Sequence, residues 1–158
     1  MELLEDSHGV RVRLIGDILV FHHFERIVPA TVRVIESARA KARAISPRVG
    51  MLIIAEASAP TPDADARAQV AKIMKTNEGH ITAMAQVVRG EGFGAAALRS
   101  VLAGLGLLTR TAYPIKVFPN IRDAVAWLVV KNGAPSSSAG PIAEVAETFA
   151  AIPRTTPR

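Results

Sequence analysis

Three of the four histidines and one glutamate are the side chains best suited to chemistry, because imidazole and carboxylate groups bind metals and transfer protons. His22 and His23 are neighbours in an apolar stretch, and in a strand their side chains would point to opposite faces of the sheet. His80 opens another apolar stretch. A metal centre needs three or four converging ligands, and the sequence supplies no others. We therefore interpret these residues as polar histidines at the edge of a sheet, with no metal and no cofactor.

Two further features sit where open α/β sheets bind ligands. Glu56 follows an apolar strand at its carboxyl end, but without a partner carboxylate it reads as a solvated loop residue. The segment RGEGFG, residues 89–94, places glycines between a strand and a helix, as phosphate-binding loops do. These glycines alternate instead of following the G-x-G-x-x-G pattern, and Glu91 would repel a phosphate. We expect a sharp turn here, and no catalytic residue anywhere in the chain.

The composition narrows the classes of function. The 158 residues include no cysteine, which excludes disulfides, thiolate catalysis and zinc–thiolate centres. The formal charge is +5, but the basic residues are spread along the chain, so nucleic acid is not an expected partner. The best apolar run, 93–108, is too short for a membrane span and is interrupted by Arg99. The acidic start lacks the pattern of a secretory leader, and we expect a cytoplasmic protein.

Hydrophobic periodicity divides the chain into alternating strands and helices. Residues 10–15 alternate apolar and basic side chains, and Gly16-Asp17 joins them to a second strand, 18–23, in a tight hairpin. Further strands are expected at 49–57, 80–88 and 115–119, and helices within 24–46, 62–75, 93–108 and after Asn120. Strands that alternate with helices form a mostly parallel sheet through right-handed crossovers.

The expected fold class is α/β, with a five-stranded, mostly parallel sheet that has an antiparallel N-terminal hairpin strand and is covered by about four helices. This domain would span residues 10–131. Residues 132–141, rich in Ser, Pro and Gly, are predicted to be a flexible linker, and 142–152 a short amphipathic helix. Such a short helix is unstable alone in water, so it should dock on its own domain, on another copy or on a partner. Residues 153–158 are predicted to be a disordered tail.

One short segment carries a family resemblance. In VFPNIRDAVAWL, residues 117–128, a strand ending near Phe118 is followed by a capped helix with Ala124, Trp127 and Leu128. Together with the order of the elements, this segment resembles the STAS superfamily, the domains of sulfate transporters and anti-sigma-factor antagonists. The closer likeness is to a divergent STAS-like branch, related to lipid-binding CRAL-TRIO domains and found as small bacterial proteins. The resemblance implies a STAS-like fold.

The sequence departs from that family at the site of its phosphorylation switch. Anti-sigma-factor antagonists carry an Asp-Ser-Ser-Gly-like motif where the third strand meets the second helix, and a kinase phosphorylates a serine there. Here the segment reads AEASAPTPDADAR, in which Ser58 and Thr61 are the only hydroxyl side chains. A phosphate at a helix start would meet free backbone N–H groups, so both are candidate phosphorylation sites. The alternative is that Thr61 and Asp63 only cap the helix.

The expected helix 93–108 is apolar around most of its circumference, so part of its surface should stay exposed after it packs on the sheet. Either the C-terminal helix or a second copy of the chain would cover that part. The candidate interface residues are Phe93, Leu102, Leu105, Leu108, Ile142, Val145 and Phe149.

These observations lead to two binding functions. The first is a non-catalytic, STAS-like module that acts in regulation through protein–protein contact and self-associates. The second, which the relation to CRAL-TRIO domains implies, is a binder of a small apolar ligand or lipid. A phosphorylation-switched regulator is a further alternative. An enzyme would need a cluster of titratable groups in a cleft, which the sequence does not show.

Overall fold

The computed structural model describes residues 2–59, 63–76, 79–108 and 110–153, without the side chains of residues 105–108. The strands are β1 (Glu2–Ser7), β2 (Val10–Ile15), β3 (Ile18–His23), β4 (Val49–Glu56), β5 (Ile81–Arg89) and β6 (Ile115–Phe118). The helices are α1 (Pro29–Ile45), α2 (Ala64–Thr76), α3 (Phe93–Leu108), α4 (Ile121–Lys131) and α5 (Ala139–Ala151), with a 3₁₀ turn at Ser136–Ser138. No helix in this described part is long and apolar enough to cross a membrane.

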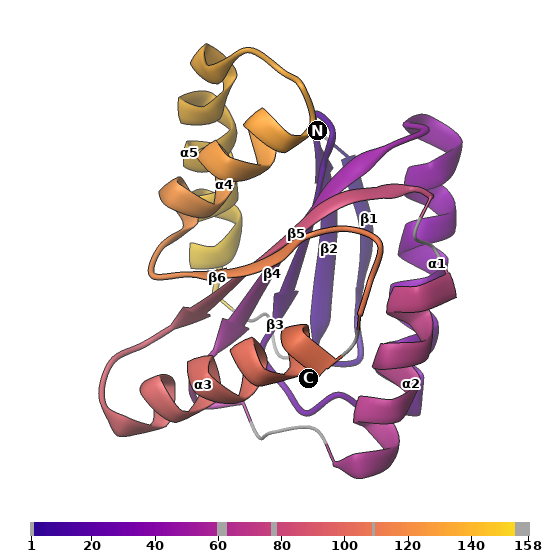
Figure 1. Cartoon of the computed structure of the whole chain (residues 1–158), viewed down its shortest axis with the longest axis vertical. Coiled ribbons are helices and arrows are strands. Elements are labelled where there is room, and N and C mark those ends of the chain that lie inside the picture. Colours follow the sequence, from indigo (N-terminus) through magenta and orange to yellow (C-terminus); the bar gives the residue numbers. More distant parts are fainter. Residues whose placement is uncertain (1, 60–62, 77–78, 109, 154–158) are drawn as a thin grey trace.

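All six strands form one sheet in chain order, from β1 at one edge to β6 at the other. The pairs β1–β2 and β2–β3 are antiparallel, and β3, β4, β5 and β6 run parallel to one another. The α/β class and the mostly parallel sheet with an antiparallel N-terminal hairpin are therefore confirmed (Figure 1). Helices connect the parallel strands, as the alternation of the sequence requires.

The sheet has one strand more than the five predicted. Strand β1 lies outside β2 at the edge, and its residues are mostly exposed, with only Leu4 buried. An acidic edge strand of this kind gives almost no hydrophobic periodicity. The cue that was present is the two-residue turn His8-Gly9, in which both residues have positive φ (49° and 77°), the conformation that tight hairpins favour.

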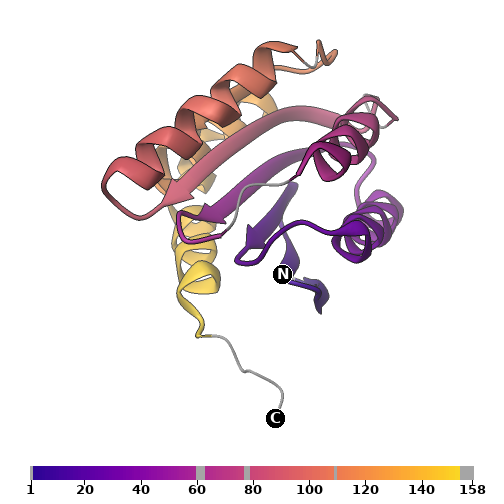
Figure 2. The ribbon, with the colours of Figure 1, turned by 90° about the horizontal axis from the view of Figure 1, so that it is seen from below.

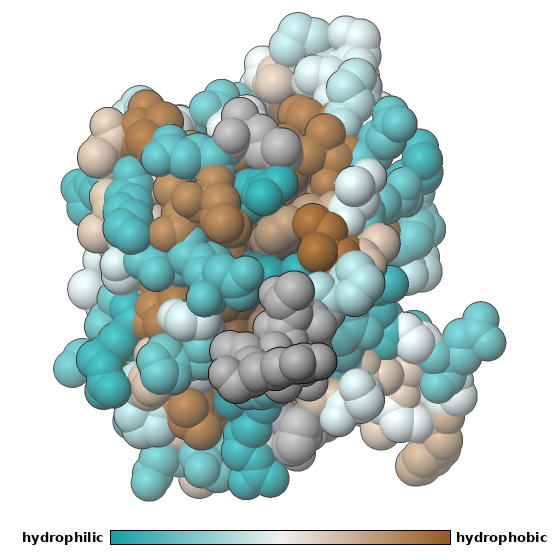
Figure 3. Space-filling model, turned by 180° about the vertical axis from the view of Figure 1, so that it is seen from behind, coloured by the Kyte–Doolittle hydropathy of each residue, from teal (hydrophilic) through white to brown (hydrophobic). Residues whose placement is uncertain are grey.

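The sheet is covered on both faces, which gives the molecule two hydrophobic cores. Helices α1 and α2 lie on one side of the sheet, and α4 and α5 lie on the other (Figure 2). The side chains of successive strand residues alternate between the two cores, as in Leu19 and Val20 of β3. On the side opposite to the view of Figure 1, polar residues divide the exposed apolar ones into separate patches (Figure 3).

Helix α4 forms as its pattern predicts. The side chain of Asn120 accepts a hydrogen bond from the backbone N–H of Asp123 at 2.8 Å, which satisfies one of the free donors of the first turn. The apolar face Ile121, Ala124, Val125, Leu128 and Val129 is buried against the sheet and α5.

The C-terminal helix docks on its own domain. Helix α5 packs against α4 and reaches β2, on the face of the sheet opposite α1 and α2. It begins at Ala139 and follows a 3₁₀ turn, so helical structure occupies the second half of the stretch 132–141 that was predicted to be a flexible linker. Residues 154–158 of the predicted tail lie outside the described residues.

Candidate functional site

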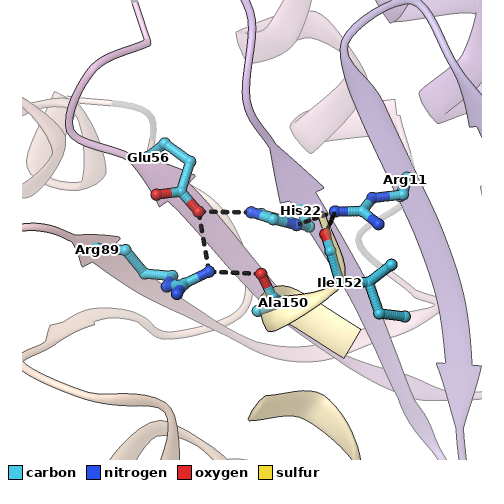
Figure 4. Close-up of polar contacts among 6 residues, drawn as sticks. All are labelled: Arg11, His22, Glu56, Arg89, Ala150 and Ile152. Atoms are coloured by element: carbon cyan, nitrogen blue, oxygen red, sulfur yellow. Dashed lines mark hydrogen bonds and ion pairs between the residues drawn. The ribbon is translucent and has the colours of Figure 1, made fainter. Parts of the chain in front are cut away.

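A network of polar side chains crosses the α5 face of the sheet near the carboxyl ends of the parallel strands. His22 Nε2 lies 2.7 Å from Glu56 Oε1, and Arg89 Nη1 donates to the same oxygen at 3.0 Å. Arg11 Nη2 lies 3.2 Å from His22 Nδ1. Four strands thus contribute one residue each, joined by the contacts that Figure 4 shows.

The partners of His22 determine its tautomer. A guanidinium group only donates hydrogen bonds, so Nδ1 of His22 accepts from Arg11 and the proton resides on Nε2, which donates to Glu56. Burial lowers the pKa of His22, and the positive charges of Arg11 and Arg89 act in the same direction, against the effect of Glu56. Neutral His22 is therefore the form that the folded protein favours near neutral pH.

Both arginines of the network also bind the end of α5. Arg11 Nη2 donates to the carbonyl oxygen of Ile152 at 2.9 Å, and Arg89 Nη1 donates to that of Ala150 at 2.5 Å (Figure 4). The last carbonyl groups of a helix have no partner within the helix, and cations stabilise that end. The network therefore fastens α5 to the sheet.

Glu56 is consequently not the solvated loop residue that we expected. It is the last residue of β4, and its side chain is only 27% exposed while it pairs with His22 and Arg89. The hydrogen bonds of the network join β2, β3, β4 and β5 to one another and to the end of α5. We assign the network a structural role.

A cavity of about 170 Å³ lies on the other face of the sheet. Its floor is formed by β3, β4 and β5, and its walls by α1, α2 and α3. The lining is mainly apolar and includes Phe21, Met51, Ile53, Met84, Leu98 and Leu102. Two charged side chains at the surface of the molecule, Glu25 and Arg67, also line it.

Three buried polar side chains line this apolar cavity. The exposed fractions are 3% for Arg39, 7% for His23 and 8% for Gln86. The atoms Arg39 Nε, Arg39 Nη2, His23 Nδ1 and Gln86 Oε1 are buried and have no hydrogen-bond partner among the described residues. Buried polar atoms are nearly always paired in native proteins, and these four belong to side chains that line one cavity, which makes it the candidate functional site.

The charges of the cavity follow from this burial. Burial lowers the pKa of His23 to about 4, and the neighbouring His22 acts in the same direction, so His23 is neutral near neutral pH. Burial also lowers the pKa of Arg39, whereas Tyr113 and Glu36 favour its charged form. Arginine keeps its proton in proteins, so Arg39 is the one charge among the three buried polar side chains.

The histidines are separated as the strand geometry predicts. His22 faces α5, where its ring contacts Phe149, and His23 faces the cavity. His80 lies at the opposite end of the sheet, just before β5, with its Nδ1 2.8 Å from the carbonyl oxygen of Pro47. Among the described residues, no group of three or more His, Cys, Asp or Glu could hold a metal ion.

The glycine segment 89–94 forms the turn between β5 and α3. Gly90 and Gly92 have φ values of 111° and 87°, which only glycine adopts without strain. A Cβ atom at Gly90 would lie 2.9 Å from the Cβ of Ala57, so a side chain there would also collide with the neighbouring loop. The glycines serve the sharp turn that was expected.

The two candidate phosphorylation sites remain predictions. Ser58 is exposed in the turn after β4, five residues before Asp63. Thr61 lies outside the described residues. The N-terminus of α2 is capped by Asp63, whose Oδ1 accepts from the backbone N–H of Ala66 at 2.8 Å, which agrees with the capping alternative for that residue.

The candidate interface residues on α3 fall into different environments. Phe93 is 91% exposed, whereas Leu102 is half-buried and lines the cavity. The side chains of Leu105 and Leu108 lie outside the described residues. Because α5 lies on the opposite face of the sheet, it does not cover α3, which removes one of the two explanations for an apolar α3.

The candidate interface residues on α5 face the interior of the chain. Ile142 and Val145 are half-buried against the core on that face of the sheet. Phe149 is 2% exposed, and the guanidinium groups of Arg11 and Arg13 lie 5.6 and 5.0 Å from the centre of its ring. Phe149 is therefore a core residue, because the apolar face of α5 packs on its own domain.

The fold is STAS-like. A structure search aligns it with an uncharacterized protein of the DUF3478 family from Shewanella loihica PV-4, which has a SpoIIAA-like fold. The two are 16% identical, the alignment covers 78% of this chain and 97% of that one, and the TM-score is 0.56. No family model matches the sequence, and no curated protein does. At this identity the similarity concerns the fold alone, and it confirms the STAS-like fold that the sequence led us to expect.

Proposed function

We propose that this chain is a non-catalytic, STAS-like module that binds a small apolar molecule in the cavity between the sheet and helices α1, α2 and α3. The observation that carries the proposal is an apolar lining that includes polar side chains with a few buried atoms for which the described residues provide no partner. Small-molecule sites have this composition, since apolar walls supply affinity and a few polar groups fix orientation.

The size of the cavity limits the ligand. An apolar cavity of about 150 Å³ holds a molecule the size of benzene, and the cavity here has about 170 Å³. The ligand, or the part of it that enters the cavity, therefore has about the size of one aromatic ring. Of the two binding functions suggested by the sequence, this geometry favours the small apolar ligand.

A cavity-filling substitution tests the proposal. Toluene should bind the full-length chain saturably, shifting the amide resonances of cavity residues in NMR spectra, and Ala71→Phe should weaken that binding by about tenfold or more. Ala71 lines the cavity, whereas Ala68 on the same helix is exposed, so Ala68→Phe is the matched control and should bind toluene normally. Absence of saturable binding to the unmodified chain would refute the proposal, as would equal binding by Ala71→Phe.

A second candidate function is self-association through α3, in a regulatory role. Phe93, Ala97 and Val101 follow one another at four-residue intervals along the helix, and all three are exposed. An exposed phenylalanine in an apolar stripe is unusual for a monomer. Apart from the neighbouring residues and backbone of α3 itself, no described atom lies within 4 Å of a Cβ atom built at Gly94 or Gly104, so the backbone of an identical helix could approach closely.

Equilibrium sedimentation tests whether the chain self-associates through α3. We expect dimers in equilibrium sedimentation, with a dissociation constant that rises by about tenfold or more for Phe93→Asp. Val130 is also an exposed apolar residue, 61% exposed on α4, so Val130→Asp is the matched control and should leave the dimer intact. A monomeric unmodified chain, or a dimer that is equally weakened by both substitutions, would eliminate α3 as the interface.

A further inference from the structure

We infer that the ligand of the cavity is a small apolar carboxylic acid, bound as its carboxylate by Arg39. The inference rests on the proposed ligand-binding function and adds the chemical class of the ligand. It depends on the position of Arg39 on α1, where the residue is 3% exposed and lines the cavity.

The guanidinium group of Arg39 is only partly satisfied. Its Nη1 donates to the carbonyl oxygen of Ile73 at 3.0 Å, and its Nε and Nη2 have no partner in the described part of the chain. No Asp or Glu of the described residues lies within ion-pair distance of it. A buried charge without a counter-ion is strongly unfavourable, so a ligand that supplies the opposite charge would gain affinity here.

The two unpaired nitrogens point to a carboxylate in particular. Nε and Nη2 lie on one edge of the planar guanidinium group, and their parallel N–H bonds match the two oxygens of a carboxylate. A sulfate or phosphate would carry further charged oxygens into a lining that is mainly apolar, at a large desolvation cost. A small carboxylic acid has one charged group attached to an apolar body, and the apolar lining can accept that body.

Arg39 determines the charge of the preferred ligand, because the other polar groups of the cavity favour neither charge. His23 is neutral near neutral pH, and Gln86 carries no charge. The charged residues Glu25 and Arg67, which are exposed, have opposite signs and do not favour one charge. A benzoate-sized anion therefore fits both the charge and the volume of the site.

Paired probes of the same size test the inference on the full-length chain. By calorimetric titration at neutral pH, benzoate should bind about tenfold or more tightly than benzyl alcohol, which lacks the charge. Arg39→Met should remove this preference by weakening benzoate, while benzyl alcohol binds within about threefold of its original affinity. Arg39→Lys keeps the charge without the parallel pair of N–H bonds, so its preference should be intermediate.

The controls separate this inference from the proposal on which it rests. Arg43→Met removes an exposed arginine that lies one turn after Arg39 on α1 and outside the cavity lining, and it should leave the preference for benzoate unchanged. If benzyl alcohol binds as tightly as benzoate, or if Arg39→Met and Arg39→Lys both retain the preference, the carboxylate inference is wrong and the ligand-binding function stands. If toluene, benzoate and benzyl alcohol all fail to bind, the proposed function itself is wrong.

Discussion

Replacing Phe149 by alanine should lower the free energy of unfolding by about 3–5 kcal/mol, the range for removing a buried phenylalanine ring from a core. The ring is 2% exposed, contacts His22 edge-on and lies beneath the guanidinium groups of Arg11 and Arg13. Its loss leaves a cavity and removes two cation–π contacts at the point where α5 meets the sheet. Urea unfolding followed by circular dichroism measures the effect.

Thr148→Ala is the matched control for this prediction. Thr148 precedes Phe149 on α5, and its exposed side chain donates only to the carbonyl oxygen of Glu144, within the helix. We expect this variant to stay within about 0.5 kcal/mol of the unmodified protein. A loss of less than about 1 kcal/mol for Phe149→Ala would show that α5 does not contribute to the core as described.

Stability should also fall as the pH is lowered from about 6.5 to 4. The folded protein lowers the pKa of His23 to about 4, so in this range the unfolded chain binds a proton that the folded chain does not. Stability is therefore complete above the pKa of the unfolded state and decreases as the pH approaches 4. A difference of about 2.5 pH units corresponds to about 3 kcal/mol.

His22 should also make the folded protein less stable as the pH falls, because burial lowers the pKa of His22 as well. In contrast, the hydrogen bond with Lys41 lowers the pKa of Glu5, so any contribution from Glu5 is lost only at more acidic pH, from about 4.5 downward. The histidines therefore account for most of the decrease that we expect between pH 6.5 and 4.5.

Denaturant midpoints measured across this pH range test the assignment. His23→Phe keeps a ring beside Phe21, on which the imidazole stacks, and should flatten the dependence of stability on pH. The control is His8→Asn in the exposed turn before β2, which should retain the slope that His23 produces. A slope that is identical with and without the imidazole of residue 23 would contradict a buried, neutral His23.

The sequence predicted those elements whose signal lies within a single segment. The alternation of strands and helices, the capping by Asn120 and the opposite directions of His22 and His23 all depend on neighbours along the chain. Strand β1 was missed because an exposed acidic edge strand has almost no apolar pattern.

The candidate site depends on neighbours across the sheet, which one sequence does not reveal. The network on the opposite face depends on them as well: Glu56 is the register partner of Arg89, and His22 reaches Glu56 diagonally because the register partner of His22 is Ile54. A weak signal did exist for the cavity. Gln86 interrupts the apolar strand ITAMAQVV, and Arg39 occupies an inward position of α1 next to Ala38 and Ala42. A polar residue on the buried face of a strand or helix is the pattern that would have indicated Gln86 and Arg39.

Strand β1 has a consequence for how the protein behaves at high concentration. The free side of an edge strand can serve as a template for strands of other molecules, which leads to fibrils. Here the β1–β2 register shifts between Leu3 and Glu5, and Glu2 and Asp6 place negative charges along the strand. An irregular, charged border of this kind repels a second molecule, so the strand that contributes least to the core protects the protein from aggregation.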